Sequence, residues 1–66
     1  MRIRYDANLD ALYISLDRSR IVDSDELKPG IVLDYNARNQ VVGIEVLNLK
    51  RRVPKSDLKQ LEGLVD

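Results

Sequence analysis

Carboxylates are the groups of this chain best suited to chemistry, because the sequence contains neither histidine nor cysteine. The commonest general base, the thiol nucleophile and the usual zinc ligands are therefore excluded, and only oxygen ligands for a hard cation remain. Asp34 and Glu45 are expected on one face of a sheet in neighbouring strands, where pairing would raise the pKa of one carboxyl group. Arg2 and Arg4 are expected on the same face, so cross-strand ion pairs are the simpler interpretation. We therefore predict that the protein is not an enzyme.

A second group of oxygen ligands, Asp6, Asn8 and Asp10, has the spacing that opens a calcium-binding loop. Asp17 falls on the twelfth position of such a loop. Two requirements are not met, because Ala11 stands where glycine makes the turn and the twelfth position is aspartate rather than bidentate glutamate. We expect a hydrogen-bonded hairpin loop here, with no metal and no cofactor.

One stretch of the chain is basic: Lys50, Arg51, Arg52 and Lys55. No aromatic residue is interleaved with this basic patch to stack on a base, and the whole chain balances Lys+Arg 11 against Asp+Glu 11. Single-sign runs of this length are usually solvated connectors. We expect no nucleic-acid partner, and it remains open whether the patch meets the acidic residues 23–26 of the same chain or of a second copy.

Two similar stretches must position these side chains. YDANLDALYISL, residues 5–16, aligns without a gap with YNARNQVVGIEV, residues 35–46. Apolar residues alternate before and after a short polar loop in each copy, which predicts one β-hairpin over residues 2–16 and another over residues 30–47. Asp6 and Asn36 open the loops, where either side chain can accept hydrogen bonds from backbone N–H groups two residues on. Asn39 tolerates the left-handed conformation that such loops need.

The rest of the chain predicts a short edge strand around residues 20–26 and a C-terminal helix. Charged residues suit an edge strand, because they discourage pairing with another sheet. Pro54 marks a boundary, after which Ser56 can cap the helix. Its apolar stripe consists of Leu58, Leu61, Leu64 and Val65. The predicted fold is α+β, a single domain over residues 1–66: an antiparallel β-meander of four or five strands, built from two repeated hairpins, with the helix packed on one face.

The two faces of the predicted sheet differ in character. The apolar face carries Ile3, Tyr5, Leu12, Ile14, Leu16, Ile31, Leu33, Val42, Ile44 and Val46. The opposite face is mixed, and Gly43, the repeat counterpart of Tyr13, leaves room for something packed close over the backbone, for which a tyrosine ring is a good candidate. Apolar residues grouped on this mixed face predict an interface. Its candidate residues are Tyr13, Val32, Val41, Gly43, Glu45 and Leu47.

The stretches YDANLDALYISL, KPGIVLDYN and VVGIEVLNL resemble a family of small bacterial and archaeal proteins known only as domain of unknown function number 2283. The resemblance runs from about residue 3 to residue 49. The family usually has aspartate and glycine where this chain has Asn36 and Asn39, and asparagine suits both positions. The resemblance implies a meander of strands with a terminal helix and no assigned activity. It also implies one specific hypothesis, because members of this type are suspected of acting as the antitoxin beside a small toxin.

Length and composition favour an interaction protein over an enzyme. A chain of 66 residues buries only about 60% of its unfolded surface, so a second subunit would add useful stability. The first residues do not have the apolar core of a signal peptide, and no apolar run reaches membrane-spanning length, so we expect a cytoplasmic location. We predict a non-catalytic protein-interaction module that forms a homodimer, with the antitoxin role as its sharper form. The alternative is a carboxylate-based hydrolase or hard-cation-binding protein that uses Asp6, Asp10, Asp34 and Glu45.

Overall fold

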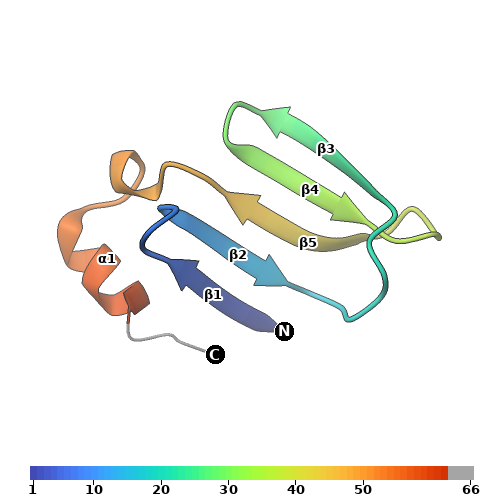
Figure 1. The fold of residues 1–66 in the computed structure, drawn as a ribbon, viewed down its shortest axis with the longest axis horizontal. Helices are drawn as coiled ribbons and strands as arrows, with labels where there is room; N and C mark the ends of the chain where they lie inside the picture. Colours follow the sequence, from blue (N-terminus) through green and yellow to red (C-terminus); the bar gives the residue numbers. More distant parts are fainter. Residues whose placement is uncertain (63–66) are drawn as a thin grey trace.

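The computed structural model describes residues 1–62 of the 66-residue chain, which form a five-strand antiparallel sheet followed by one 3-10 turn and one α-helix (Figure 1). The strands are β1 (Arg2–Asp6), β2 (Ala11–Ser15), β3 (Asp23–Lys28), β4 (Ile31–Tyr35) and β5 (Val41–Val46). The 3-10 turn η1 spans Leu49–Arg51 and the helix α1 spans Lys55–Glu62. The predicted α+β class and antiparallel sheet with one C-terminal helix are confirmed.

The strand order across the sheet is β1-β2-β5-β4-β3. The predicted hairpins are β1–β2 and β4–β5, and they join where β2 pairs with β5. The fifth strand, β3, lies at an edge beside β4, and all six of its residues are exposed. An edge strand was predicted there, but it begins at Asp23, after the exposed apolar residues Ile21 and Val22.

Both hairpin loops are held as their first residues predict. The Oδ1 atom of Asp6 accepts a hydrogen bond from the backbone N–H of Asn8 at 2.9 Å, and the Oδ1 atom of Asn36 accepts one from the backbone N–H of Arg38 at 3.0 Å. Asn39 adopts a left-handed conformation, with φ of 61°. The loop signals in the sequence are therefore confirmed at each of these positions.

The two hairpins are related by an approximate two-fold axis that is perpendicular to the sheet. Ile14 of β2 pairs with Ile44 of β5, which is its own counterpart in the other repeat. The pairs on either side exchange the repeats in the same way: Tyr13–Glu45 and Ser15–Gly43. The sequence repeat is thus a structural repeat, and its axis passes beside the two isoleucines.

The helix contributes little cover to the sheet within the described residues. Its main contacts are with β1 and η1, at one end of the sheet (Figure 1). It begins at Lys55, so Ser56 lies inside the first turn instead of capping it. Leu58 is buried, while the predicted stripe residues Leu64 and Val65 lie outside the described residues.

Most of the apolar face is half-buried rather than enclosed. Its partly covered side chains are Ile3, Tyr5, Leu12, Ile14, Ile31, Leu33, Ile44 and Val46. The buried apolar residues among residues 1–62 are Ala11, Val42, Leu49 and Leu58. Within residues 1–62, no helix is long and apolar enough to cross a membrane.

Candidate functional site

A hydrogen-bonded network on the mixed face connects strands on both sides of β5. The hydroxyl of Tyr13, on β2, donates a hydrogen bond to Oδ2 of Asp34, on β4, at 2.9 Å. The hydroxyl of Ser24, on β3, donates to Oδ1 of the same carboxylate at 2.6 Å. Asp34 is only 8% exposed, so these two bonds supply the partners that a buried carboxylate requires.

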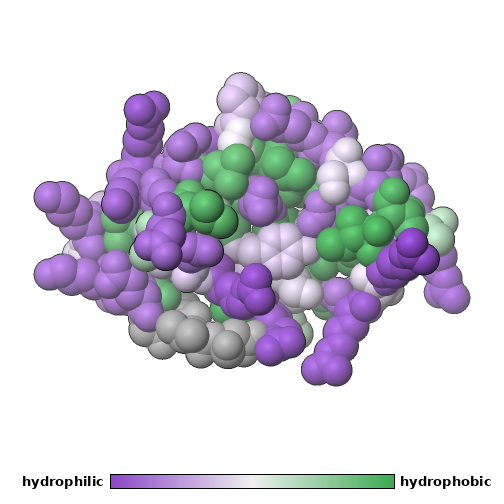
Figure 2. Space-filling view, viewed as in Figure 1, coloured by the Kyte–Doolittle hydropathy of each residue, from purple (hydrophilic) through white to green (hydrophobic). Residues whose placement is uncertain are grey.

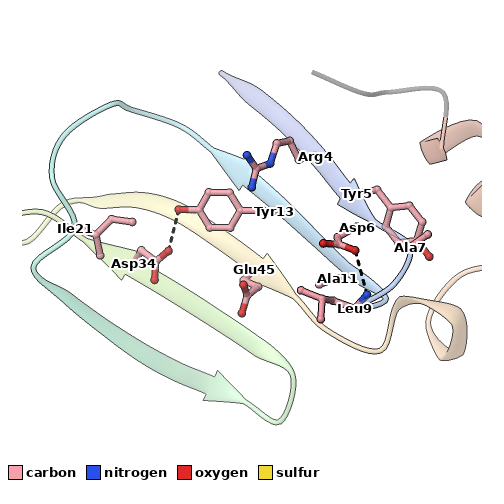
Figure 3. Close-up of a pocket in the computed structure, with 10 residues that line it drawn as sticks. All are labelled: Arg4, Tyr5, Asp6, Ala7, Leu9, Ala11, Tyr13, Ile21, Asp34 and Glu45. Atoms are coloured by element: carbon pink, nitrogen blue, oxygen red, sulfur yellow. Dashed lines mark hydrogen bonds between the residues drawn. The ribbon is translucent and has the colours of Figure 1, made fainter.

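Gly43 makes this network possible, because it lies on β5 directly under the tyrosine. A Cβ atom at Gly43 would overlap the hydroxyl of Tyr13 and would lie 2.9 Å from its Cζ atom and 3.1 Å from Oδ2 of Asp34. Figure 3 shows the Tyr13 ring lying flat over the sheet, with its hydroxyl turned toward Asp34. The prediction that a tyrosine ring packs over Gly43 is confirmed.

The electrostatic potential around the Tyr13 hydroxyl is negative. Burial raises the pKa of its hydroxyl above the ordinary value, and the hydrogen bond to Asp34 and the charges of Asp34 and Glu45 raise it further. The Arg4 guanidinium lowers the pKa and is the weakest of these influences. The hydroxyl therefore keeps its proton at neutral pH and acts as a hydrogen-bond donor.

The ring forms part of a hollow of about 610 Å³ on the mixed face. Arg4 and Glu45 flank the ring on opposite sides, and the apolar side chains of Leu9 and Ile21 lie toward the two ends of the hollow (Figure 3). Leu9 is 72% exposed and Ile21 is 45% exposed. Figure 2, which shows this face, has apolar groups around its middle with hydrophilic side chains between and around them.

Asp34 and Glu45 lie in neighbouring strands of one face, as predicted, but their surroundings differ. Both carboxylate oxygens of Asp34 accept hydrogen bonds, whereas the half-buried carboxylate of Glu45 makes no hydrogen bond or ion pair with residues 1–62. The expected ion pairing of these carboxylates with Arg4 is not formed in that part of the chain. Glu45 is therefore a charge without a partner in the described structure.

The carboxylates of the first hairpin loop hold the loop itself. Asp6 closes the turn, and the Asp10 carboxylate accepts hydrogen bonds from the backbone N–H of Lys50 and the hydroxyl of Tyr5, all at 3.1 Å. Asp10 has a left-handed backbone, with φ of 52°. No group of three histidine, cysteine, aspartate or glutamate residues is placed to hold a metal ion within residues 1–62. These contacts give both residues structural roles: Asp6 closes the loop, and Asp10 ties it to η1.

The basic patch has Lys50 and Arg51 on η1, Arg52 directly after it and Lys55 at the start of α1, and all four are exposed. Arg52 is engaged in the fold: its Nε donates to the carbonyl of Leu47 at 2.9 Å and its Nη2 donates to the carbonyl of Pro29 at 2.8 Å. Its guanidinium passes over Gly30, where a Cβ atom would lie 2.6 Å from Nη2. Arg52 therefore fastens η1 to the β3–β4 turn, a role that no sequence signal indicated. In the part of the chain that the structure describes, no ion pair joins the patch to residues 23–26.

The residues predicted as an interface are partly brought together. Tyr13, Glu45 and Val32 are neighbours across β2, β5 and β4, and Gly43 lies beneath the ring. Val41 is the first residue of β5 and is exposed, whereas Leu47 directly follows the last residue of β5 and is half-buried. No local signal indicated the parts of Ser24, Leu9 and Ile21, because the edge strand and the connecting segments that carry them meet this face only after folding.

These features define a small α+β domain with a repeated-hairpin sheet and a tyrosine-centred polar network. Residues 2–50 match the family model described as "Protein of unknown function (DUF2283)". The match covers more than half of the chain, so the protein belongs to this family and the resemblance seen in its sequence is confirmed. No curated protein and no solved structure matches the chain.

Proposed function

We propose that the protein is a non-catalytic protein-interaction module that works as a homodimer, with the apolar face of its sheet as the interface. The observation that carries the proposal is the half-buried state of the side chains on that face. Sheets bury an apolar face against a second layer in stable domains. A second copy would supply that layer with the same residue types on both sides.

The shape of the chain supports a missing layer. Its extents are 37 × 25 × 16 Å, and its radius of gyration is 12.4 Å, against about 10.8 Å for a compact chain of this length. Its accessible surface is 5151 Å², roughly 850 Å² more than a compact monomer of 7.6 kDa exposes. Stable interfaces bury about 800 Å² on each partner, so one face-to-face dimer would account for the difference.

The choice of face differs from the interface predicted by sequence. On the mixed face Tyr13 is hydrogen-bonded and covers Gly43, and charged groups such as Arg4 and Glu45 stand beside it. Pairing this face with its own copy would take these charged groups out of water. The apolar face has mainly aliphatic side chains in β1, β2, β4 and β5, and its acidic residues Asp23 and Asp25 lie on the edge strand β3, so packing over the other four strands removes apolar surface with little desolvation of charge.

A non-catalytic role is supported by the chemistry of the candidate groups. The sequence has no histidine or cysteine, and both oxygens of Asp34 are already bonded to hydroxyl groups. The antitoxin role is one form of this proposal, in which the dimer presents its outer surfaces to a small toxin. Two experiments test the antitoxin role. A stoichiometric partner should copurify with the protein from native cells, and the protein should rescue cells that express this partner.

Sedimentation equilibrium at micromolar concentrations tests the dimer. We expect twice the chain mass of 7.6 kDa, and a 7.6 kDa species at all concentrations would refute the proposal. Two adjacent substitutions in β4 identify the face, because Leu33 and Val32 point to opposite sides and are both half-buried. Leu33→Lys should dissociate the dimer while Val32→Lys should not, with circular dichroism confirming that both variants fold. The reverse result would place the interface on the mixed face.

A further inference from the structure

The hollow around Tyr13 has an unused polar side that the dimer proposal does not explain. Glu45 is half-buried and its carboxylate has no partner within residues 1–62. The carboxylate is partly removed from water, and a bound cation would supply a counter-charge, with the modest gain of a partly exposed ion pair. The hollow thus contains a carboxylate, that of Glu45, with which a bound cation would form an ion pair.

Charge in the hollow favours a cation. The ionisable carboxyl groups that line it belong to Asp6, Asp34 and Glu45, against a single guanidinium on Arg4. The Asp34 carboxylate accepts hydrogen bonds from two neutral hydroxyl groups, and these do not neutralise its negative charge. Burial is the main cause of the raised pKa of Tyr13, and the negative charges of Asp34 and Glu45, which raise that pKa further, also attract a cation.

The ring of Tyr13 offers a platform for such a cation. Because Gly43 has no side chain, the ring lies flat on β5 and turns its other face outward (Figure 3). A cation over the face of a tyrosine is attracted by the ring quadrupole. Arg4 lies at the side of the ring and not over that outer face in Figure 3, so the face remains accessible.

Apolar side chains at the ends of the hollow add a second requirement. Leu9 and Ile21 are large, exposed and close to the polar centre, with Ile21 beside Asp34 in Figure 3. A bare metal ion or an inorganic anion would leave these side chains in water. A ligand with a hydrocarbon stem would cover one of them while its charged end reaches the ring.

We propose that this hollow binds a cationic group carried on an apolar stem, with the cation over the Tyr13 ring and against Glu45. The chemistry is that of an arginine or lysine side chain of a partner protein, or of a free alkylamine. This inference goes beyond the proposed function, since the mixed face stays outside a dimer formed through the apolar face. Each dimer would then carry two such sites on its outer surfaces.

Amide-detected NMR titration of the full chain tests the proposal with four probes. The cationic probes are N-acetyl-arginine amide and n-butylammonium, and the matched neutral probes are N-acetyl-citrulline amide and N-acetyl-norleucine amide. We expect saturable shifts at residues around Tyr13 with both cationic probes and none with the neutral ones. Tighter binding of the arginine probe would identify a protein partner as the source, and tighter binding of butylammonium would identify a free amine.

Three substitutions should change the affinity for the cationic probes, each in a stated direction. Glu45→Gln should weaken binding about fivefold, as expected for one partly exposed charge pair. Tyr13→Leu should weaken it about threefold through loss of the cation–π contact. Arg4→Gln should tighten it, because the competing cation is removed. Asp25→Asn, on exposed β3 outside the hollow, is the control and should change nothing.

Two results would overturn the inference. One is equal response to the citrulline and arginine probes, since a neutral isostere cannot satisfy Glu45. The other is unchanged affinity in Glu45→Gln together with weaker affinity in Arg4→Gln, which would mean that the hollow selects anions. The amide spectrum of each free variant shows whether it is folded, and Glu45→Gln preserves the size of the side chain, so a folded variant is expected.

Discussion

Substitution of Gly43 by alanine is the most direct test of the tyrosine-centred network. The added Cβ atom would overlap the Tyr13 hydroxyl and would lie 2.9 Å from its Cζ atom. Backbone strain does not enter, because the one glycine with positive φ among residues 1–62 is Gly30. The clash can be relieved only by moving the ring, and that movement breaks the 2.9 Å hydrogen bond to Asp34.

Gly43→Ala makes two contributions of opposite sign to the free energy of unfolding. Loss of a hydrogen bond to a charged group that is 8% exposed costs about 1.5–3 kcal/mol. Alanine in place of glycine in a strand interior contributes about 0.5–1 kcal/mol in the favourable direction. Gly43→Ala should therefore destabilise the fold by about 1–2 kcal/mol. In a Tyr13→Ala background the clash is absent, and the same substitution should stabilise by about 0.5–1 kcal/mol.

The assay is a double-mutant cycle by urea unfolding, followed by far-ultraviolet circular dichroism because the chain has no tryptophan. All four proteins are compared at one concentration, since dimerisation would make stability depend on it. The coupling free energy between positions 13 and 43 should be about 1.5–3 kcal/mol. A coupling below about 0.5 kcal/mol would refute the reasoning, because such additivity is typical of residues that do not touch.

Three further predictions concern the residues that hold the loops and the network. Arg52→Lys should destabilise by about 1 kcal/mol in urea unfolding, because one ammonium cannot reproduce the fork that bonds two carbonyls. Asp10→Ala should cost about 1 kcal/mol more than Asp10→Asn by the same measurement, because asparagine tolerates the left-handed backbone and alanine does not. The pKa of Tyr13, followed by NMR of ring carbons, should fall in Asp34→Asn. Because that pKa is raised in the fold, its stabilising contribution is complete below about pH 10, the unfolded value, and is lost as pH rises through the folded value.

Local signals account for much of what the sequence predicted correctly. Hairpins depend on alternation and on turn residues, and both are properties of short stretches, so Asp6, Asn36 and Asn39 could be assigned to their loop roles directly. The glycine in mid-strand was also interpretable, since a missing side chain implies a close neighbour. The ring that fills the space comes from Tyr13, on the adjacent strand.

Contacts between segments distant in the sequence were harder to foresee. Arg52 looked like one member of a basic run, yet its guanidinium binds the carbonyl of Pro29, 23 residues away. Ser24 looked like an ordinary polar residue of an edge strand until β3 paired with β4 and placed its hydroxyl beside Asp34. Both roles depend on the register and order of strands, which no local pattern encodes.

The two repeats differ at positions 13 and 43, which lie close to the approximate two-fold axis of the sheet. Tyr13 and Gly43 are counterparts, and the approximate two-fold axis beside Ile14 brings each close to the other. Two tyrosines there would occupy the same space, so only one repeat can carry the ring. The counterpart of Asp34 is Arg4, and a tyrosine at position 43 would meet a hydrogen-bond donor where Tyr13 meets an acceptor. The ring must therefore belong to the first repeat, and the open carboxylate of Glu45 and the accessible ring face exist because the symmetry is broken in this direction.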